Sequence, residues 1–136
     1  MQDDTPNGWA AVAAGSYIAL GTYRRSGVLV TTPVWVASVG PAMVVTTEPA
    51  TGKVKRLRND PRVVIRPCSA RGRVNPGAVT LHARCEIIAP DGDQRDAVAA
   101  LRRKYGLQYS AVQLVERVIR GVQRKHPERV ILRITP

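Results

Sequence analysis

The sequence predicts an α+β fold in which six or seven short antiparallel strands form a compact barrel with a few helices at its periphery. Two observations support this prediction. Short runs rich in β-branched residues alternate with glycine- and proline-containing turns through most of the first 90 residues. Helical spacing of apolar residues is strongest after residue 90, and a final β-rich run closes the chain. A length of 136 residues fits one domain, residues 1–136, whose first 14 residues form an N-terminal segment that is either helical or flexible.

Five β-rich runs come before the late helices. They cover residues 16–22, 28–38, 43–47, 62–68 and 78–89, and a last strand is predicted over 129–135. The first three runs are expected to form a meander, with Gly27 at positive φ in a turn and Pro33 at a sheet edge or a bulge. In the fifth run apolar residues alternate with polar ones, which predicts a buried face made of Val79, Leu81, Ala83, Cys85 and Ile87.

Three helical segments are predicted. In the first, Thr51 is the expected N-cap, Val54 and Leu57 share the buried face, and the sequence 59–61 ends the helix. The second begins with Asp91 or Asp93 as its cap and stops at Gly106, with an apolar stripe made of Ala97, Val98, Leu101 and Tyr105. The third has an apolar stripe made of Val112, Val115, Ile119 and Val122.

The net charge narrows the classes of partner. Lys and Arg number 21 against 10 acidic residues, which gives a formal net charge of +11. This balance favours a polyanionic partner, which could be nucleic acid, an anionic membrane or a multiply charged small molecule. No apolar run reaches the roughly 18 residues that a membrane helix needs. The N-terminus opens with acids and has no basic leader, so we expect no signal peptide and a cytoplasmic location.

Catalysis by side chains alone is poorly supported. Cys68 and Cys85 are expected to be two buried thiols on strands, and cysteine and histidine are too few for a zinc site. Acids near His82 and His126 are sparse and the sequence has no nucleophile elbow, so it offers no plausible Ser/His/Asp set. A bound cofactor that carries the reaction fits this sequence better.

The segment 51–58 (TGKVKRLR) is the best candidate for an anion site. A capped helix start leaves backbone N–H groups unpaired and favours negative charge. Lys53 adds an ammonium there and Arg56 lies one turn on along the same face. Lys55 lies about 200° around the helix from Lys53, at roughly 100° per residue. The alternative is an ordinary solvated basic face, and the segment lacks the spacing of a P-loop.

The segment 31–35 (TTPVW) is a candidate for contact with a heterocycle. A strand interrupted by Pro33 leaves backbone groups free to meet a polar ring edge, and Trp35 offers a flat apolar surface. The alternative places Trp35 in the core and Pro33 at a bulge. Thr46 and Thr47 end the strand before the basic helix, so their hydroxyls could reach a phosphate or a ribityl chain.

Together these segments resemble the split β-barrel oxidoreductases related to pyridoxamine phosphate oxidase, in the branch that uses the deazaflavin coenzyme F420. The stretches that carry the resemblance are SYIALGTYRRSG, TTPVW, TGKVKRLRNDPRV, PCSARG and LRRKYGLQY, in the order of the family. The resemblance implies the FMN-binding split-barrel fold and a homodimer with two cofactor sites at the subunit interface. The resemblance implies that the cofactor phosphate lies at Thr47, Lys53, Lys55 and Arg56, and that the deazaflavin ring lies along Thr32, Pro33, Val34 and Trp35. Their neighbours Thr46, Gly52 and Val54 complete the predicted cofactor-binding set.

The leading hypothesis is therefore an F420-dependent oxidoreductase that transfers a hydride between the coenzyme and a small unsaturated or quinone-like substrate. One alternative keeps the fold and replaces the cofactor with FMN. Another is a nucleic-acid-binding module, which aromatic residues at only 4% and the lack of a duplex-reading motif make the weaker hypothesis. A cofactor-binding protein without turnover also stays open.

Overall fold

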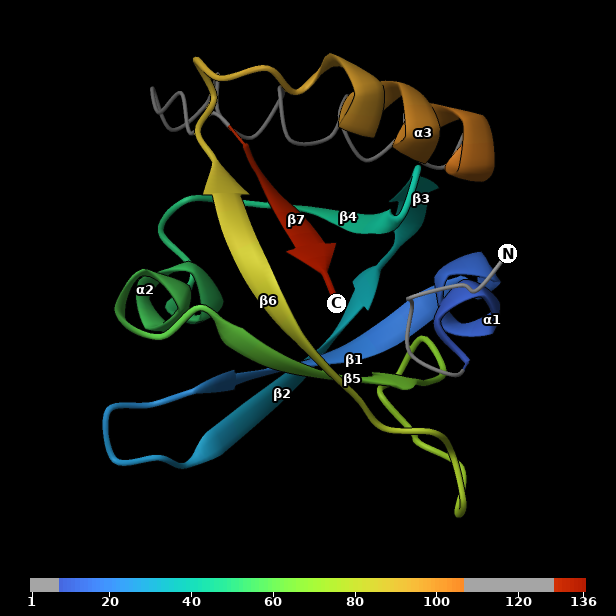
Figure 1. Ribbon diagram of the computed structural model, residues 1–136, viewed down its shortest axis with the longest axis vertical. Coiled ribbons are helices and arrows are strands. Elements are labelled where there is room, and N and C mark those ends of the chain that lie inside the picture. Colours follow the sequence, from blue (N-terminus) through green and yellow to red (C-terminus); the bar gives the residue numbers. More distant parts are fainter. Residues whose placement is uncertain (1–7, 107–128) are drawn as a thin grey trace.

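The computed structural model describes residues 8–106 and 129–136. In these residues seven antiparallel strands form one strongly curled sheet in the order β2-β1-β5-β6-β7-β4-β3 (Figure 1). The strands are β1 (Tyr17–Tyr23), β2 (Leu29–Trp35), β3 (Ala37–Val39), β4 (Ala42–Thr47), β5 (Arg62–Pro67), β6 (Leu81–Ile88) and β7 (Val130–Thr135). The helices are α1 (Trp9–Ala14), α2 (Gly52–Asn59) and α3 (Arg95–Tyr105). The predicted α+β barrel is confirmed.

The predicted strand over residues 28–38 is divided at Val36. Before the division β2 pairs with β1 from Leu29 to Trp35, and after it β3 pairs with β4. β2 and β3 are the two outer strands of the sheet, so one residue joins its two edges. Both antiparallel pairings of the predicted meander are present, but its middle strand is bent at Val36, so β2 and β3 lie at opposite edges of the sheet and β4 also pairs with β7. The expected edge position of Pro33 is confirmed.

Lys104 and Tyr105, at the end of α3, bind the backbone around this bend. The Tyr105 hydroxyl accepts a hydrogen bond from the Val36 N–H at 3.0 Å and lies 2.7 Å from the Val36 oxygen and 2.6 Å from the Ser16 oxygen. The Lys104 Nζ donates to the carbonyl oxygens of Ala13, Gly15 and Val36 at 2.8, 2.5 and 2.7 Å. Backbone groups that the bend removes from the sheet ladder thus keep partners, as buried polar groups require.

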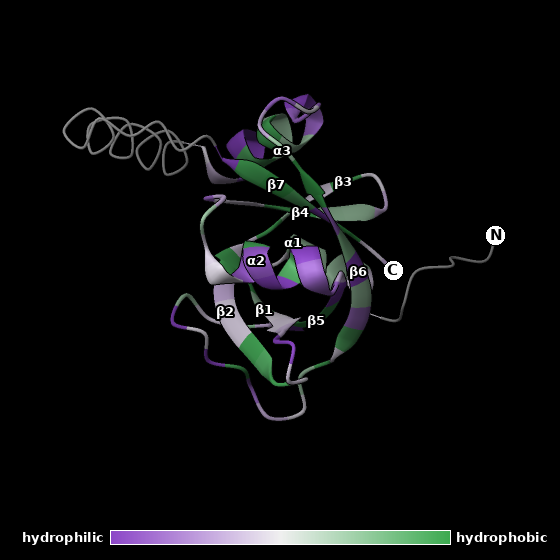
Figure 2. Ribbon diagram, turned by 90° about the vertical axis from the view of Figure 1, so that its left-hand side faces the viewer, coloured by the Kyte–Doolittle hydropathy of each residue, from purple (hydrophilic) through white to green (hydrophobic). Residues whose placement is uncertain are grey.

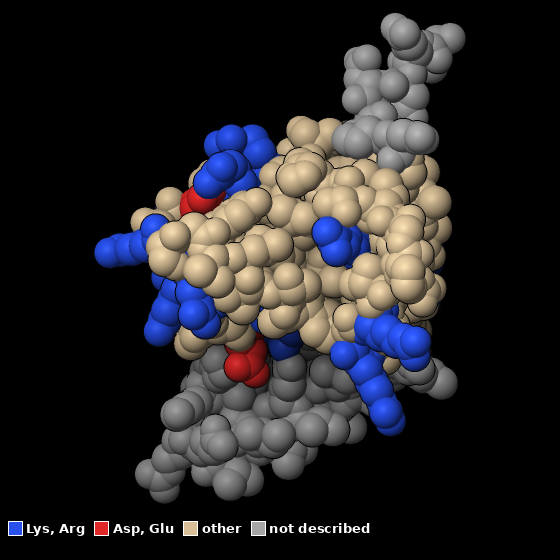
Figure 3. Space-filling view, turned by 90° about the horizontal axis from the view of Figure 1, so that it is seen from below, with Lys and Arg blue, Asp and Glu red and all other residues tan. Residues whose placement is uncertain are grey.

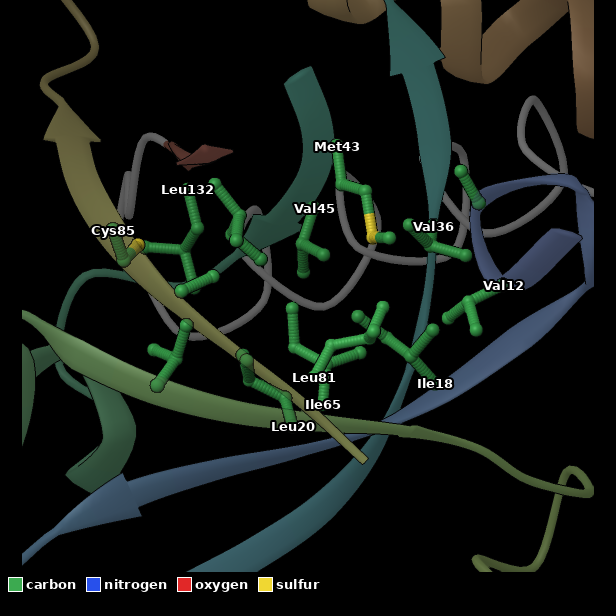
Figure 4. Close-up of a cluster of buried hydrophobic side chains, with 14 of the residues drawn as sticks. Val12, Ile18, Leu20, Val36, Met43, Val45, Ile65, Leu81, Cys85 and Leu132 are labelled. Carbon is green, nitrogen blue, oxygen red and sulfur yellow. The ribbon is translucent and has the colours of Figure 1, made fainter. Parts of the chain in front are cut away.

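The barrel interior holds the main core. Side chains from all parts of the sheet point toward one another there (Figure 4), among them Ile18, Leu20, Met43, Val45, Ile65, Leu81 and Leu132. α1 adds Val12, and α2 adds Val54 and Leu57. α2 lies across one end of the barrel with its polar face outward (Figure 2). A second cluster on the opposite face of the sheet joins Ala97, Ala100 and Leu101 of α3 to Ala37, Val44 and Ile131.

Most boundaries agree with the sequence predictions, and four details do not. Val79 precedes β6 and is exposed, because the alternating face begins only at Leu81. Cys85 is buried on β6, but Cys68 follows β5 and is half-buried. The N-cap of α3 is Gln94 and not Asp91 or Asp93, although the Asp93 carboxylate accepts a hydrogen bond from the N–H of Arg95, the first helical residue.

Thr51 occupies the N-cap position of α2, but its hydroxyl donates backward to the Glu48 carbonyl at 3.1 Å and caps no helical N–H. The N-terminal segment was expected to be either helical or flexible, and residues 9–14 are helical. The helix predicted through Val112, Val115, Ile119 and Val122 lies outside the described residues, as do residues 1–7.

Candidate anion-binding site

The first turn of α2 follows directly on β4 and has a positive end. An α-helix leaves its first N–H groups without partners inside the helix, here those of Gly52, Lys53 and Val54. The turn contains no acidic residue that would neutralise them, and the Thr51 hydroxyl is directed away from them. The end of the helix therefore favours an anion.

Three basic side chains lie together at this helix start. Burial lowers the pKa of the half-buried Lys53 ammonium below its ordinary value, and the positive charges of Arg56 and Arg129 lower it further. The negative charge of the Glu48 carboxylate raises the pKa of Lys53 and so partly opposes these effects. Lys53 and Arg56 are one turn apart on the same helix face, as predicted. We call Lys53, Arg56 and Arg129 the cation cluster.

Arg56 lies back over the start of its own helix. Its Nε donates to the Thr22 hydroxyl of β1 at 2.6 Å, and Thr22 is fully buried. A Cβ on Gly52 would lie 2.8 Å from the Arg56 Nη1, so the glycine leaves the space that the guanidinium occupies. Gly52 and Arg56 were predicted from the sequence, whereas Thr22 was not, because a threonine within a β-rich run carries no signal for this role.

Arg129 was also missed. Its Nε donates to the Thr46 hydroxyl at 2.9 Å and its Nη2 donates to the Thr46 carbonyl at 3.2 Å. Its own carbonyl accepts a hydrogen bond from the Gln94 side chain at 3.1 Å. Arg129 directly precedes β7, which pairs with β4, the strand that leads to α2. Only the pairing of β4 with β7 indicates that Arg129 lies near the start of α2, and these two strands are far apart in the sequence.

The structure separates the predicted phosphate residues into two groups. Thr46, Gly52, Lys53 and Arg56 come together, and Thr47 is buried at the end of β4. The Val54 side chain lies in the core, so only its backbone N–H can face a ligand. Lys55 is exposed on another face of the helix, where it lines a cavity with residues of the β1–β2 turn.

The four predicted ring-binding residues lie along the edge strand β2. Cross-strand partners in an antiparallel pair point to the same face, so Thr32 faces the barrel interior with Leu20, and Val34 does so with Ile18. The Thr32 hydroxyl is buried and has no hydrogen-bond partner among the described residues. Such a hydroxyl costs free energy unless a further group satisfies it.

Pro33 and Trp35 face the other side of β2. The Pro33 ring is exposed and lies close to Gly72, in the loop that follows β5. A cavity of about 310 Å³ opens within that loop, and Cys68, Ser69, Arg73 and Asn75 are among its lining residues. Trp35 stacks on Tyr105, with ring centroids 4.7 Å apart and an interplanar angle of 11°, so one face of its ring is covered by protein.

These residues fit a phosphate-bearing flavin-type group. The cation cluster and the start of α2 suit the phosphate, while the edge strand and the unsatisfied Thr32 hydroxyl suit a heterocycle with polar edges. Within residues 8–106 and 129–136, no three His, Cys, Asp or Glu side chains come together as metal ligands. No described helix is long and apolar enough to cross a membrane.

Comparisons with known proteins identify the fold. No family model matches the sequence, and no curated protein sequence gives a significant match. An F420 reductase of known structure superposes with a TM-score of 0.62 at 19% identity, over 97% of this chain and 95% of that one. The chain has the split β-barrel fold.

Two further proteins of similar structure bind different groups. The heme storage protein HutZ from Vibrio cholerae has a TM-score of 0.62 at 13% identity, over 89% of this chain and 81% of that one. An FAD-binding protein from Mesorhizobium loti has a TM-score of 0.54 at 16% identity, over 93% of this chain and 82% of that one. At these identities the likeness establishes the split barrel alone, and the ligand must be argued from the site.

Proposed function

We propose that this protein is an F420-dependent oxidoreductase, in which the cation cluster binds the coenzyme phosphate and β2 lies along the deazaflavin ring. The observation that carries the proposal is the meeting of Lys53, Arg56 and Arg129 at the positive end of α2. Structural similarity to an F420 reductase and to an FAD-binding protein supports a flavin-type cofactor on this fold.

The electrostatics of the cluster favour a bound anion. Lys53 loses part of its hydration and lies near the positive charges of Arg56 and Arg129. The lost hydration and the repulsion both disfavour the charged form of Lys53. A phosphate beside the three side chains would offset this repulsion and accept charge-assisted hydrogen bonds. The N–H groups at the start of α2 point to the same place, so the backbone and the side chains favour the same ligand charge.

The chain's own residues bind and orient in this proposal. When bound, F420 supplies the hydride that a small unsaturated or quinone-like substrate accepts, or takes one up in the reverse direction. Thr32 offers its buried hydroxyl to a polar ring edge, and Pro33 and Trp35 belong to the same strand. His82 is exposed on β6.

We also propose that the protein acts as a homodimer. β2 is an edge strand with no neighbour on its outer side among the described residues. Leu29, on this strand, and Val28, just before it, are exposed apolar side chains, with 40% and 53% of their surfaces accessible. A second copy packed against this edge would cover them and complete a wall for the ring.

The first test is a fluorescence titration of F420, and separately FMN, with the purified protein. We expect low-micromolar binding of F420 and weaker binding of FMN. Lys53→Gln should lower F420 affinity about tenfold or more, because a charge-assisted hydrogen bond contributes about 1.5–3 kcal/mol. Arg58→Gln removes the same charge from an exposed site on the same helix and should change affinity little. Unchanged affinity in the Lys53 variant would contradict the assignment, and tight FMN binding with weak F420 binding would move the cofactor to FMN.

The same variant separates binding from stability. The pKa of Lys53 in the folded protein lies below its ordinary value of 10.5, so this group stabilises the fold above pH 10.5 and the contribution is lost as pH falls through the lowered value. Near neutral pH the charged ammonium therefore opposes folding. Lys53→Gln should leave the free energy of unfolding unchanged or slightly raised in urea denaturation at pH 7 while it weakens binding.

A further inference from the structure

The loop between β5 and β6 contains a cavity that the proposed cofactor site does not use. The loop covers residues 68–80 and projects from the barrel (Figure 1). The cavity measures about 310 Å³, a volume within the usual range for sites that hold small molecules. It is lined by Pro67, Cys68, Ser69, Arg73, Asn75 and Ala78. These residues combine apolar walls with a few polar groups, which is the composition typical of such sites.

Hydrogen bonds within the loop hold its backbone in shape. The Ser69 N–H donates to the Arg73 carbonyl at 3.0 Å, and the Arg73 N–H donates to the Ser69 hydroxyl at 3.1 Å. The Gly72 N–H donates to the Ser69 carbonyl at 2.9 Å, and Gly72 takes a φ of +85°, which glycine adopts readily. Further along, the Ala78 N–H donates to the Asn75 carbonyl at 3.1 Å. The side chains that line the cavity therefore start from defined backbone positions.

Arg73 gives the cavity a positive charge that the protein does not neutralise. Neither of the ion pairs between described residues includes Arg73, and no acidic residue is among those that line the cavity. Burial raises the pKa of the Cys68 thiol, so this wall of the cavity is uncharged near pH 7. A guanidinium beside a hollow without acids raises the local concentration of anions.

The polar groups of the cavity suit a carboxylate. A guanidinium binds a planar carboxylate through two parallel N–H groups. The Asn75 amide and the Ser69 hydroxyl can donate further hydrogen bonds to the same group. One cation with neutral donors matches a single negative charge, whereas a phosphate with up to two charges matches the three basic side chains of the cation cluster.

The surface charge also favours a small anion at this place. On the face shown in Figure 3, Lys and Arg side chains of the described residues stand in separate groups, with no continuous stripe that would track a long polyanion. A ligand with one carboxylate needs only one such group.

The loop lies against the strand that is proposed to run along the deazaflavin ring. A Cβ on Gly72 would lie 3.5 Å from the Cγ and Cδ atoms of the Pro33 ring, so the loop backbone touches the outer side of β2. Arg73 directly follows Gly72 in the chain. A ligand held by Arg73 is therefore close to β2, and a substrate must lie near the ring to exchange a hydride with it.

We propose that this cavity binds the carboxylate of a small organic acid through Arg73, and that this acid is the substrate of the oxidoreductase. The assignment as substrate rests on the proposed function, whereas the binding of a carboxylate does not. The substrate class then narrows from any small unsaturated or quinone-like molecule to one that carries a carboxylate.

Protection of Cys68 tests the cavity without any coenzyme. Benzoate is the probe, and the readout is the rate at which iodoacetamide alkylates Cys68, followed by mass spectrometry of the peptide that contains it. Saturating benzoate should slow this alkylation at least fivefold, because Cys68 lines the cavity. Benzamide, which has a similar shape without the charge, should give no protection at the same concentration.

Two arginine variants test the role of Arg73. Arg73→Gln should raise the benzoate concentration that gives half-protection at least tenfold. Arg71→Gln removes the same charge from an exposed position in the same loop that does not line the cavity, so it should keep the wild-type value. No protection in wild type, equal protection by benzamide, or equal losses in the two variants would overturn the carboxylate site.

A second measurement tests the assignment as substrate. Oxidation of reduced F420 is followed with anthraquinone-2-carboxylate and with its uncharged amide as acceptors. The acid should have a kcat/KM at least tenfold above that of the amide. Arg73→Gln should remove this preference by raising KM, and Arg71→Gln should keep it.

The outcomes separate the two parts of the proposal. Equal kcat/KM for the acid and the amide in wild type would overturn the assignment as substrate. If wild type bound no F420, the proposed function and the assignment as substrate would both fail, and the protection of Cys68 would still decide whether the cavity binds a carboxylate.

Discussion

At the scale of single residues, Gly52 shows how an absent side chain can shape a binding site. The residue lies in the first turn of a regular helix, so its backbone does not require glycine. What requires it is the Arg56 guanidinium, whose Nη1 occupies the space beside its Cα. The position of the Arg56 side chain, which we propose binds phosphate, thus depends on a neighbour that has no side chain of its own.

Gly52→Ala should therefore separate binding from stability. A Cβ would displace the end of the flexible Arg56 side chain, so ligand affinity should fall several-fold, while alanine's better helix propensity keeps the free energy of unfolding unchanged or raises it by up to about 1 kcal/mol. A double-mutant cycle with Arg56→Ala, read by F420 titration, checks the cause. In the Arg56→Ala background the glycine substitution should have no further effect, and a full second loss would contradict the steric explanation.

The candidate site was predictable to the extent that its residues are close in sequence. Helical spacing places Lys53 and Arg56 on one face and sets Lys55 apart, and the structure agrees. Arg129 could not be found this way, because its neighbourhood depends on the pairing of β4 with β7. The aromatic surface of Trp35 was recognised from its strand, but the stacking of Tyr105 on it depends on the docking of α3.

At the scale of elements, the bend between β2 and β3 depends on α3. The run 28–38 is uniformly rich in β-branched residues, so nothing in its own sequence marks Val36 as a break. Lys104 and Tyr105 stabilise the break, because their polar atoms hydrogen-bond to the N–H and the carbonyl of Val36, which have no partner in a neighbouring strand. The strand boundaries were predictable from local patterns, whereas this division required knowledge of a distant helix end.

Tyr105→Phe tests this dependence. The change keeps the ring stacked on Trp35 but removes the hydroxyl from the Val36 N–H and the Ser16 carbonyl, and leaving the N–H of the buried Val36 unpaired costs about 1–3 kcal/mol. Urea denaturation should show that loss of unfolding free energy. Tyr23→Phe is the matched control, because the Tyr23 hydroxyl has no hydrogen bond in the part of the chain that the structure describes. Equal stabilities of the two variants would show that the hydroxyl of Tyr105 does not hold the bend.

At the scale of the whole molecule, the accessibility of the Cys85 thiol to a reagent indicates whether the barrel is closed or open. It lies in the main core, and burial, with a smaller contribution from Glu86, raises the pKa of its thiol to about 12. Cys68 is half-buried, and burial raises its pKa as well. The two thiols of the chain should therefore differ strongly in their access to a reagent, because the thiolate is the reactive form.

In a Cys68→Ser variant at pH 8, a thiol reagent should modify Cys85 only when the barrel opens. After short exposure to the reagent, the urea midpoint of Cys85 labelling should coincide with the urea midpoint of unfolding measured by circular dichroism. The two should agree because the core is shared by all parts of the sheet. The Cys85→Ser variant, which keeps Cys68, should label faster without denaturant. Rapid labelling of Cys85 in the native protein would show that the barrel opens locally at β6.

The place of β7 in the sheet has a consequence for synthesis of the chain. β7 comes after every other described strand in the sequence, yet it lies in the interior of the sheet, hydrogen-bonded to β6 on one side and to β4 on the other. Until residue 135 has left the ribosomal exit tunnel, β4 and β6 each keep an open edge and the barrel core lacks Leu132 and Ile134. Until β7 emerges, the nascent chain therefore carries two unpaired strand edges, which are sites at which partly folded chains can aggregate.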